Sequence, residues 1–283
     1  GAGSGGVFKS INNGTTWVPV FDREATTSIG SIAVAPSDAN TVWVGTGEVL
    51  MARSSYPGLG VYKSTDAGAS WTHMGLTDTH HISQVIIHPT DPQRVWVAAI
   101  GRLYSEGPER GVYRTRDGGR TWQRTLFVNE RTGAIDLALD PSDPNVLYAS
   151  MWDRSRKAWG HTPNGPGSGA YKSTDGGDTW TLLTGLPSGE HVGRIGLAIA
   201  RSNPRVLYAL VDNYAPAPAP GARGRGGARA PDRIGGEVYR SDDAGRTWRK
   251  VNTQPVATGW DFCLIQVAPD NEDIVYLPNN RFM

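Results

Sequence analysis

Five acidic residues lie in segments that are rich in turn-forming residues, and each could take part in acid–base chemistry. They are Glu48, Glu130, Asp153, Glu190 and Asp261. Hydrolysis of a glycosidic bond uses two carboxyl groups that face each other across a cleft, roughly 5 to 9.5 Å apart. The sequence does not give the separation of these side chains, so all five stay candidates for a catalytic pair.

A second set of polar and aromatic residues could bind a polar ligand. The set comprises His80, His81, Glu130, Arg131, Trp152, Trp159, His191, Arg194, Trp260 and Asp261. Carboxylate, imidazole and guanidinium groups form directed hydrogen bonds, and an indole ring can stack on a sugar or anchor a peptide. We therefore expect a glycan, a peptide or a protein as the ligand, rather than an apolar cofactor.

These residues give little support to a metal or cofactor site. His80 and His81 are adjacent, and adjacent side chains at the start of a strand point in opposite directions. The N-terminal GAGSGG matches G-x-G-x-x-G, but it lacks the preceding strand and the following helix that a dinucleotide-binding loop needs. We expect neither a bound metal nor a cofactor.

A repeated motif, which we call the box, indicates the strands and turns that position these residues. Its pattern is S/T-x-D/N-x-G-x-S/T-W. Its five copies end at tryptophans spaced 54, 51, 58 and 68 residues apart, a period typical of a propeller or a solenoid. Short polar side chains that bond nearby backbone and a glycine that permits positive φ are the chemistry of a turn. We interpret the boxes as scaffold, with Asn12, Asp66, Asp117, Asp175 and Asp243 closing the turns and Trp17, Trp71, Trp122, Trp180 and Trp248 as core packing anchors.

A second motif recurs between the boxes, as in QVIIHPTDPQRVWV (84–97) and DLALDPSDPNVLYA (136–149). Each copy predicts two strands joined by a Pro/Asp turn, a third strand such as GVYRT precedes each box, and a fourth begins at the box tryptophan. The unit is therefore a four-stranded antiparallel sheet, as in a β-propeller blade. Residues 1–283 predict a single propeller of four complete blades and two half blades.

The boxes resemble the Asp-box (BNR) repeats of sialidases, sortilin-type receptors and two-propeller xyloglucanases. The runs VWVGTGE (42–48), DTHHI (78–82) and PGSGAYKSTDGGDTW (166–180) are most similar to large bacterial sortilin-like BNR-repeat proteins. The resemblance implies a β-propeller and a secreted or periplasmic location. It implies much less about activity, because one fold hosts many functions.

Composition excludes several classes of protein. The net charge of +1 gives no general attraction to nucleic acid, and no apolar run approaches the ~20 residues of a membrane span. The single cysteine, Cys263, cannot form an internal disulfide and reads as a buried apolar residue. The Pro/Ala/Gly/Arg-rich insert at 215–236 reads as a flexible loop.

Strand alternation assigns the loops to two faces. The boxes and the Pro/Asp turns share one face, which we call the box face. The loops from second to third strands, and from one sheet to the next, share the other, which we call the variable face. Variable loops on a rigid scaffold usually carry binding residues, so we expect the site there. The chain also looks like a segment of a longer protein, and we expect an open arc rather than a ring closed by pairing residues 7–10 with 274–277.

Three functions are compatible with these features. The first is an extracytoplasmic ligand-recognition propeller within a larger sortilin-like protein, which binds a glycan or a peptide. The second is a glycoside hydrolase of the xyloglucanase type, and the third is a structural or assembly module. A second propeller with facing acidic loops would favour the hydrolase over the recognition propeller.

Overall fold

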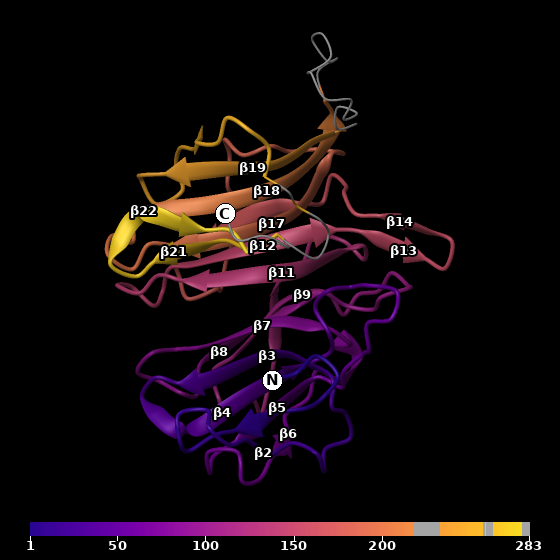
Figure 1. Cartoon of the computed structure of the whole chain (residues 1–283), viewed down its shortest axis with the longest axis vertical. Helices are drawn as coiled ribbons and strands as arrows, with labels where there is room; N and C mark the ends of the chain where they lie inside the picture. Colours follow the sequence, from indigo (N-terminus) through magenta and orange to yellow (C-terminus); the bar gives the residue numbers. More distant parts are fainter. Residues whose placement is uncertain (218–232, 257, 259–262, 279–283) are drawn as a thin grey trace.

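The computed structural model describes residues 1–217, 233–256, 258 and 263–278, and these residues form an almost entirely β-structure (Figure 1). A single 3-10 turn, η1 (Thr77–Thr79), is the helical element of the described residues. The alternation of apolar and polar residues, and the turn residues between the runs, favour strands throughout. The predicted all-β class is confirmed.

Four antiparallel sheets of four strands follow one another along the described chain. They comprise β3 (Ile29–Ala35), β4 (Asp38–Thr46), β5 (Val61–Ser64) and β6 (Thr72–His73); β7 (Ile82–Ile87), β8 (Val95–Ala99), β9 (Gly111–Thr115) and β10 (Gln123–Leu126); β11 (Thr132–Leu139), β12 (Leu147–Asp153), β15 (Gly169–Ser173) and β16 (Thr181–Leu182); and β17 (Val192–Ile199), β18 (Leu207–Pro216), β19 (Arg233–Ser241) and β20 (Arg249–Lys250). Within each sheet every strand pairs with its sequence neighbour in that sheet. The predicted four-stranded antiparallel sheets are confirmed.

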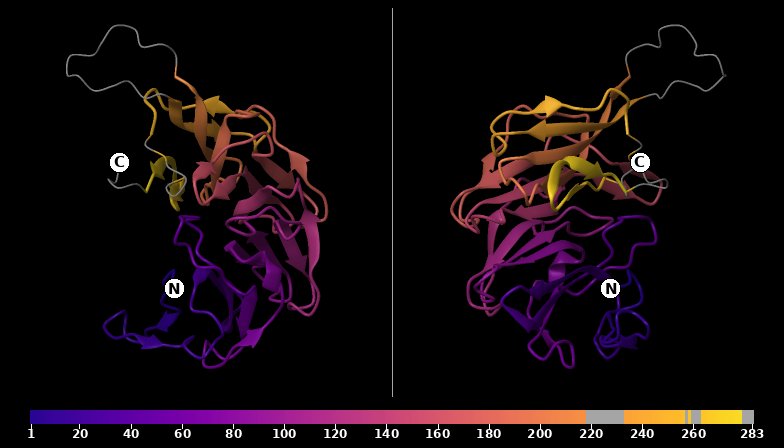
Figure 2. Two further views of the ribbon diagram at one scale, coloured as in Figure 1. Left: turned by 90° about the vertical axis from the view of Figure 1, so that its right-hand side faces the viewer. Right: turned by 60° about the vertical axis from the view of Figure 1, so that its left-hand side comes forward.

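Three further strand pairs complete the described β-structure. They are β1 (Phe8–Lys9) with β2 (Val18–Pro19), β13 (Ser155–Lys157) with β14 (Gly160–Thr162), and β21 (Gln266–Ala268) with β22 (Asn271–Tyr276). The sheets lie side by side around an arc, and the two ends of the arc lie on opposite sides of its opening (Figure 2). Residues 7–10 do not pair with residues 274–277, so strand pairing does not close the arc.

The hydrophobic core is divided into layers between successive sheets. The layer between the second and third four-stranded sheets contains Trp96 and Val112 from one side and Leu137, Leu147 and Met151 from the other. Similar layers lie at the other sheet-to-sheet boundaries. No sheet buries both faces alone, so each depends on its neighbours for stability.

The repeated boxes form one kind of turn. In the copy at residues 64–71, Ser64 Oγ donates to Asp66 Oδ1 over 2.7 Å, and Ser70 donates from its backbone N to Oδ1 and from Oγ to Oδ2. The hydrogen bonds from Ser70, more than any other contact, lower the pKa of Asp66 to about 2. Asp117, Asp175 and Asp243 accept the same bonds, which also lower their pKa values. These carboxylates are therefore occupied in closing turns.

The prediction that the box tryptophans belong to the core is wrong in part. Trp17 is exposed, and Trp71, Trp122, Trp180 and Trp248 are only half-buried. The indole N–H of Trp71 donates to Val20 O and that of Trp122 to Met74 O, both on the preceding sheet. An indole that must reach a partner near the surface stays partly exposed, so these rings tie sheets together at the rim.

The tryptophans that fill the core are Trp43 and Trp96, on second strands, and Trp152. The predicted insert at 215–236 also differs at its edges, because residues 215–216 end β18 and residues 233–236 begin β19. Residues 218–232 lie outside the described residues.

Candidate functional site

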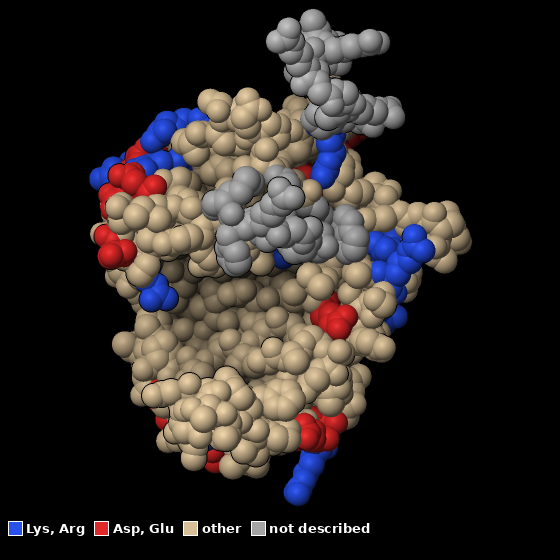
Figure 3. All heavy atoms as spheres, in the orientation of Figure 1, with Lys and Arg blue, Asp and Glu red and all other residues tan. Residues whose placement is uncertain are grey.

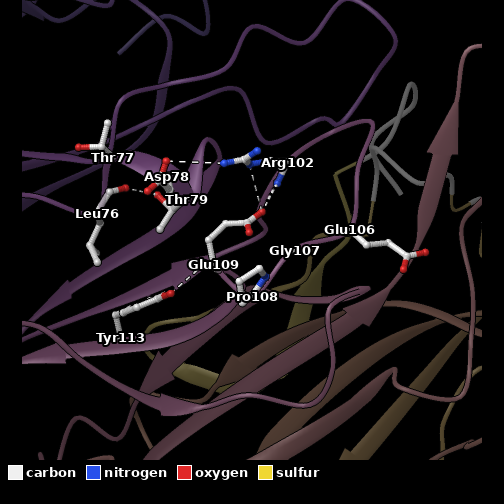
Figure 4. A pocket seen from close by; sticks show the side chains of 10 residues that line it. All are labelled: Leu76, Thr77, Asp78, Thr79, Arg102, Glu106, Gly107, Pro108, Glu109 and Tyr113. Atoms are coloured by element: carbon white, nitrogen blue, oxygen red, sulfur yellow. Dashed lines mark hydrogen bonds and ion pairs between the residues drawn. The ribbon is translucent and has the colours of Figure 1, made fainter.

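A polar cleft opens on the variable face between the first two four-stranded sheets. Its volume is about 570 Å³, and η1 with the preceding Leu76 forms one wall while the loop from β8 to β9 forms the other (Figure 4). The residues that line it are Leu76, Thr77, Asp78, Thr79, Arg102, Glu106, Gly107, Pro108, Glu109 and Tyr113.

Arg102 is the central charged group of the cleft. Its Nη2 lies 3.6 Å from Asp78 Oδ1 on the opposite wall, and its Nε lies 3.8 Å from Glu109 Oε1. The side chains of Arg102 and Asp78 are 45% and 82% exposed, whereas that of Glu109 is buried. A ligand in the cleft therefore meets one exposed cation, Arg102, and two exposed carboxylates, Asp78 and Glu106.

Two buried arginines hold the loop that carries Arg102. Arg110 donates to the carbonyl oxygens of Ile100, Arg102 and Ser105, and Arg154 donates to those of Arg102 and Leu103. Burial lowers the pKa of both guanidinium groups. Because five carbonyl contacts fix the loop backbone, Arg102 is presented from a rigid wall.

Two uncharged polar side chains, those of His80 and Tyr113, lie near the charged groups of the cleft. Burial, followed by the charge of Arg102, lowers the pKa of His80, which therefore stays neutral over a wider pH range. Tyr113 donates its hydroxyl to Glu109 O over 3.0 Å, which keeps the ring at the base of the cleft. Groups of this kind suit the hydroxyl and amide groups of a glycan or a peptide.

A second cavity, of about 700 Å³, runs along the first strands of the sheets; we call it the axial groove. Its wall comes from β7, β11, β17 and β21 with their adjoining residues, and Figure 3 shows a hollow there with mostly uncharged walls. Most of the residues that line it are apolar, among them Ile86, Leu137, Leu197 and Val267. Asp136 is the one carboxylate among the described residues that line the groove.

Asp136 links two neighbouring sheets. Its Oδ2 accepts a hydrogen bond from Leu197 N on β17 over 2.9 Å, and its Oδ1 accepts one from Leu137 N. Loss of hydration, the dominant effect, raises the pKa of Asp136 to about 6 despite these bonds and the charge of Arg194. Ser31 makes the same link from β3 to Val85 N on β7, which indicates that this position connects sheets.

Part of the variable face is buried and is not available to a ligand. Met51, Ile100, Leu103, Ile135 and Trp152 form a buried apolar cluster beneath its loops. Loops of the first two four-stranded sheets pack here against strands of the third, so this part of the face is filled. The polar cleft lies at the boundary between the first two four-stranded sheets.

Two predicted ligand-binding residues are buried here, so those predictions are wrong. Trp152 has no exposed surface, and its Nε1 donates to Pro163 O over 2.7 Å. His81 is buried beneath Glu48, where its Nδ1 lies 2.9 Å from Glu48 O, and burial lowers its pKa to about 4. Each was placed on the surface because the sequence does not show how loops from different sheets pack.

Arg194 is also buried, which contradicts its prediction as a ligand-binding residue on the surface. Its guanidinium group lies 6.0 Å from the ring of Trp152, within reach of a cation–π contact.

The predicted catalytic acids that the structure describes lie apart, three of them on separate loops and Asp153 at the end of β12. Glu48 is half-buried and its Oε2 accepts a bond from Tyr56 N, whereas Glu130 and Glu190 are exposed. Asp153 is buried; Arg131 Nη2 lies 3.1 Å from its Oδ1, and Gly167 N donates to its Oδ2. Asp153 is thus engaged in holding Arg131 and a loop.

The other predicted ligand-binding residues remain at the surface. His191 is exposed, and His80 is half-buried beside the cleft. Trp159 is 88% exposed at the turn of the β13–β14 hairpin, which projects from the arc (Figure 1). Trp260 and Asp261 lie outside the described residues.

Sequence reasoning missed Asp78, Arg102 and Glu109 in the cleft and Asp136 in the axial groove. In the first strand of the other repeats, the position of Asp136 is taken by Ser31, Gln84, Gly196 and Leu264. An acidic residue at this position of a first strand could therefore have marked Asp136 as unusual. No comparable signal marks Arg102, because its partners come from two different sheets.

The described residues contain no group of three or more His, Cys, Asp or Glu side chains positioned to hold a metal ion. Nor does this part of the chain contain a helix long and apolar enough to cross a membrane.

Comparison with known sequences finds two kinds of relative. The family described as Sortilin, neurotensin receptor 3 (Sortilin-Vps10) matches residues 60–192. Xyloglucanase Xgh74A of Acetivibrio thermocellus is 26% identical over 188 residues, which cover 62% of this chain and 20% of the relative. A xyloglucanase of Hypocrea jecorina is 29% identical over 214 residues, which cover 69% of this chain and 24% of that protein. The Vacuolar protein sorting/targeting protein 10 of Pyricularia oryzae is 34% identical over 94 residues, 32% of this chain and 6% of that protein.

Solved structures agree on the fold. A GH74 enzyme of Niastella koreensis superposes with a TM-score of 0.67 at 23% identity over 95% of this chain, and an ancestral GH74 enzyme with a TM-score of 0.66 at 21% identity over 95%. The chain covers 39% and 31% of these structures. The expected resemblance is confirmed: this chain is similar to sortilin-type and xyloglucanase-type proteins, and its fold is that of the β-propeller GH74 enzymes.

Proposed function

We propose that this chain is a ligand-recognition propeller that works outside the cytoplasm and binds a glycan or a peptide in the polar cleft on its variable face. The observation that carries the proposal is the exposed pair Arg102 and Asp78, which face each other across a cleft with rigid walls. Pre-organised polar groups bind without the entropic cost of ordering the site. The similarity to xyloglucanases and to a sorting protein supports both ligand classes.

The glycoside hydrolase is the second candidate, and two observations favour it. Xyloglucanases are among the relatives, and burial raises the pKa of Asp136 to about 6, a value useful to a general acid. However, a hydrolase needs a second carboxyl group across from the first, and the described lining of the axial groove has no other. We therefore rank recognition above hydrolysis.

A glycan and peptide array probed with matched variants tests the proposal. We expect Arg102→Ala and Asp78→Asn to weaken binding at least about tenfold, the effect of removing an interaction of roughly 1.4 kcal/mol. Arg249→Ala is the control, because Arg249 is an exposed arginine that pairs with Asp242 on the box face. Full binding by the Arg102→Ala variant, or loss of binding by the control, would refute the cleft as the site.

The same samples separate recognition from hydrolysis. Release of reducing ends from a β-glucan, lost in Asp136→Asn but kept in Arg249→Ala, would favour the hydrolase. Binding without release of reducing ends would favour the recognition module.

A further inference from the structure

Three arginines are buried close together beneath the variable face, and we call them the arginine cluster. They are Arg110, directly before β9, Arg154, directly after β12, and Arg156, on β13. Arg110 and Arg154 are each 1% exposed, and Arg156 is 7% exposed. Arginine is almost never buried to this extent unless an opposite charge accompanies it, so an anion is expected nearby.

Arg154 is surrounded by neutral acceptors and by other cations. Its guanidinium group donates to Arg102 O and Leu103 O, which carry no net charge. Burial lowers the pKa of Arg154, and the positive charges of Arg110 and Arg156 lower it further. Neutral acceptors offset only part of the cost of burying a charge, so the arginine cluster favours an anion beside it.

Two N–H donors of the arginine cluster remain available to an anion. Nε of Arg110 and Nε of Arg154 are both buried, and neither has a hydrogen-bond partner among the described residues. The terminal nitrogens of both guanidinium groups, by contrast, make the five carbonyl contacts that hold the loop. A buried donor without an acceptor is destabilising, and folded proteins nearly always satisfy such donors. An oxyanion has several lone pairs with which to satisfy them.

The arginine cluster lines a narrow pocket, which we call the arginine pocket. Residues 103–106 form one wall, and residues 155–157, at the start of the β13–β14 hairpin, form the other. Tyr104, Glu106 and Lys157 are exposed at its outer edge. Lysine and arginine side chains gather on the surface beside this hairpin (Figure 3). The pocket therefore joins the buried cluster to a positively charged part of the surface.

The width of the arginine pocket restricts which anion it can take. In the structure the pocket is too narrow for a water molecule, so a ligand enters only when one wall moves. The hairpin wall can move without breaking a four-stranded sheet, because β13 and β14 pair only with each other among the described strands. A flat group needs the smallest movement. A carboxylate is planar, whereas sulfate and phosphate are tetrahedral, so the pocket favours a carboxylate.

We propose that the arginine pocket binds the carboxylate group of an acidic ligand. The carboxylate accepts hydrogen bonds from Arg110 Nε and Arg154 Nε, and Lys157 attracts it at the outer edge. Charge-assisted hydrogen bonds of this kind are stronger than neutral ones. Uronic acid units of a glycan and acidic side chains of a peptide carry the same group. The proposal does not depend on ligand binding in the polar cleft, although Glu106 lines both cavities.

Isothermal titration calorimetry of the 283-residue chain, at constant ionic strength, tests the proposal with matched ligands. Glucuronate is compared with glucose, and a tripeptide with blocked ends and a central glutamate is compared with the same tripeptide carrying glutamine. We expect the acidic member of at least one pair to bind and neither neutral member to do so. The pair that binds identifies the ligand as an acidic glycan or an acidic peptide.

Two variants at exposed positions change the charge at the outer edge in opposite directions. Glu106→Gln removes a carboxylate that repels the ligand and should tighten binding about two- to fivefold, whereas Lys157→Gln should weaken it by a similar factor. Glu190→Gln is the matched control, because Glu190 is an exposed carboxylate on a different loop. Arg154→Met should weaken binding at least about tenfold, and its unfolding curve verifies that it is folded at the temperature of the titration.

Three results would overturn the proposal. The first is no binding of either acidic ligand, or equal binding of the neutral counterparts. The second is an affinity that stays at the wild-type value in both Glu106→Gln and Lys157→Gln. The third is inorganic sulfate that binds as tightly as the acidic ligands, because a tetrahedral anion would then fit the pocket as well as a planar one.

Discussion

At the scale of the residue, the carboxylates of this protein divide by what surrounds them. Box aspartates such as Asp66 accept several hydrogen bonds, which lower their pKa values, whereas Asp136 loses hydration, which raises its pKa to about 6. The first kind of environment stabilises the charged form and the second disfavours it. Asp136 can therefore gain or lose a proton near neutral pH, whereas the box aspartates stay ionised.

Asp136 should make the protein less stable as pH rises through about 6. Its folded pKa of about 6 exceeds the unfolded value of 3.8, so the folded state binds the extra proton between these values, and the free energy of unfolding falls as pH rises. In the wild type this effect should lower the free energy of unfolding by on the order of 2 kcal/mol between pH 4 and pH 7. We expect the Asp136→Asn variant to lack this decrease. Urea unfolding of both proteins at the two pH values measures the difference.

Two histidines have the opposite effect on the pH dependence of stability, which is why the variant is compared with the wild type. Burial lowers the pKa of His81 and of His161 to about 4, so each contributes stability that is lost as pH falls from about 6.5. These contributions are common to both proteins and cancel in the difference. An identical pH dependence in Asp136→Asn and wild type would show that Asp136 is hydrated and has an ordinary pKa.

At the scale of the element, the sheets are held together by residues of their second strands more than by the boxes. Trp96 is fully buried between two sheets, and its indole N–H donates to Gly176 O over 2.9 Å. Trp122 lies at the rim, half-buried, in edge contact with the ring of Trp43 at 5.9 Å.

Three substitutions to alanine should therefore differ in cost. We expect Trp96→Ala to lower the free energy of unfolding by about 3 to 5 kcal/mol, because a large buried ring is removed. Trp122→Ala should cost about 1 to 3 kcal/mol, since less apolar surface is lost. Trp159→Ala should have no measurable effect. Urea midpoints that rank Trp122→Ala as more damaging than Trp96→Ala would contradict this order.

At the scale of the whole molecule, Arg154 connects loops that belong to three different sheets. It follows β12 of the third four-stranded sheet and donates to Arg102 O and Leu103 O of the second, while its Nη2 also lies 3.9 Å from Met51 Sδ of the first. The polar cleft therefore depends on a residue that does not line it.

Arg154→Met should loosen the wall of the cleft. The substitution removes the hydrogen bonds that Arg154 donates to Arg102 O and Leu103 O. We expect this loss to lower the free energy of unfolding by about 2 to 4 kcal/mol. We also expect faster amide exchange at Arg102 and Gly107, while amides of β17 and β18 keep their protection, measured by hydrogen exchange. Equal acceleration in all sheets would indicate a global loss of stability rather than a local role.

The sequence by itself determined the repeating unit. Strand alternation, Pro/Asp turns and five boxes are local signals, and they predicted four-stranded antiparallel sheets because each depends on residues close together in the chain. The choice of glycine and serine in the boxes likewise follows from turn geometry.

Only the tertiary structure decided which residues face solvent and which meet across sheets. Trp152, His81 and Arg194 read as surface residues in variable loops, yet packing against loops and strands of neighbouring sheets buries all three. Arg102 and Asp78 come from different sheets, so their meeting depends on how two sheets dock. Local patterns fix strands and turns, but burial and long-range pairing are properties of the assembled arc, because they require atoms far apart in the sequence to compete for the same space.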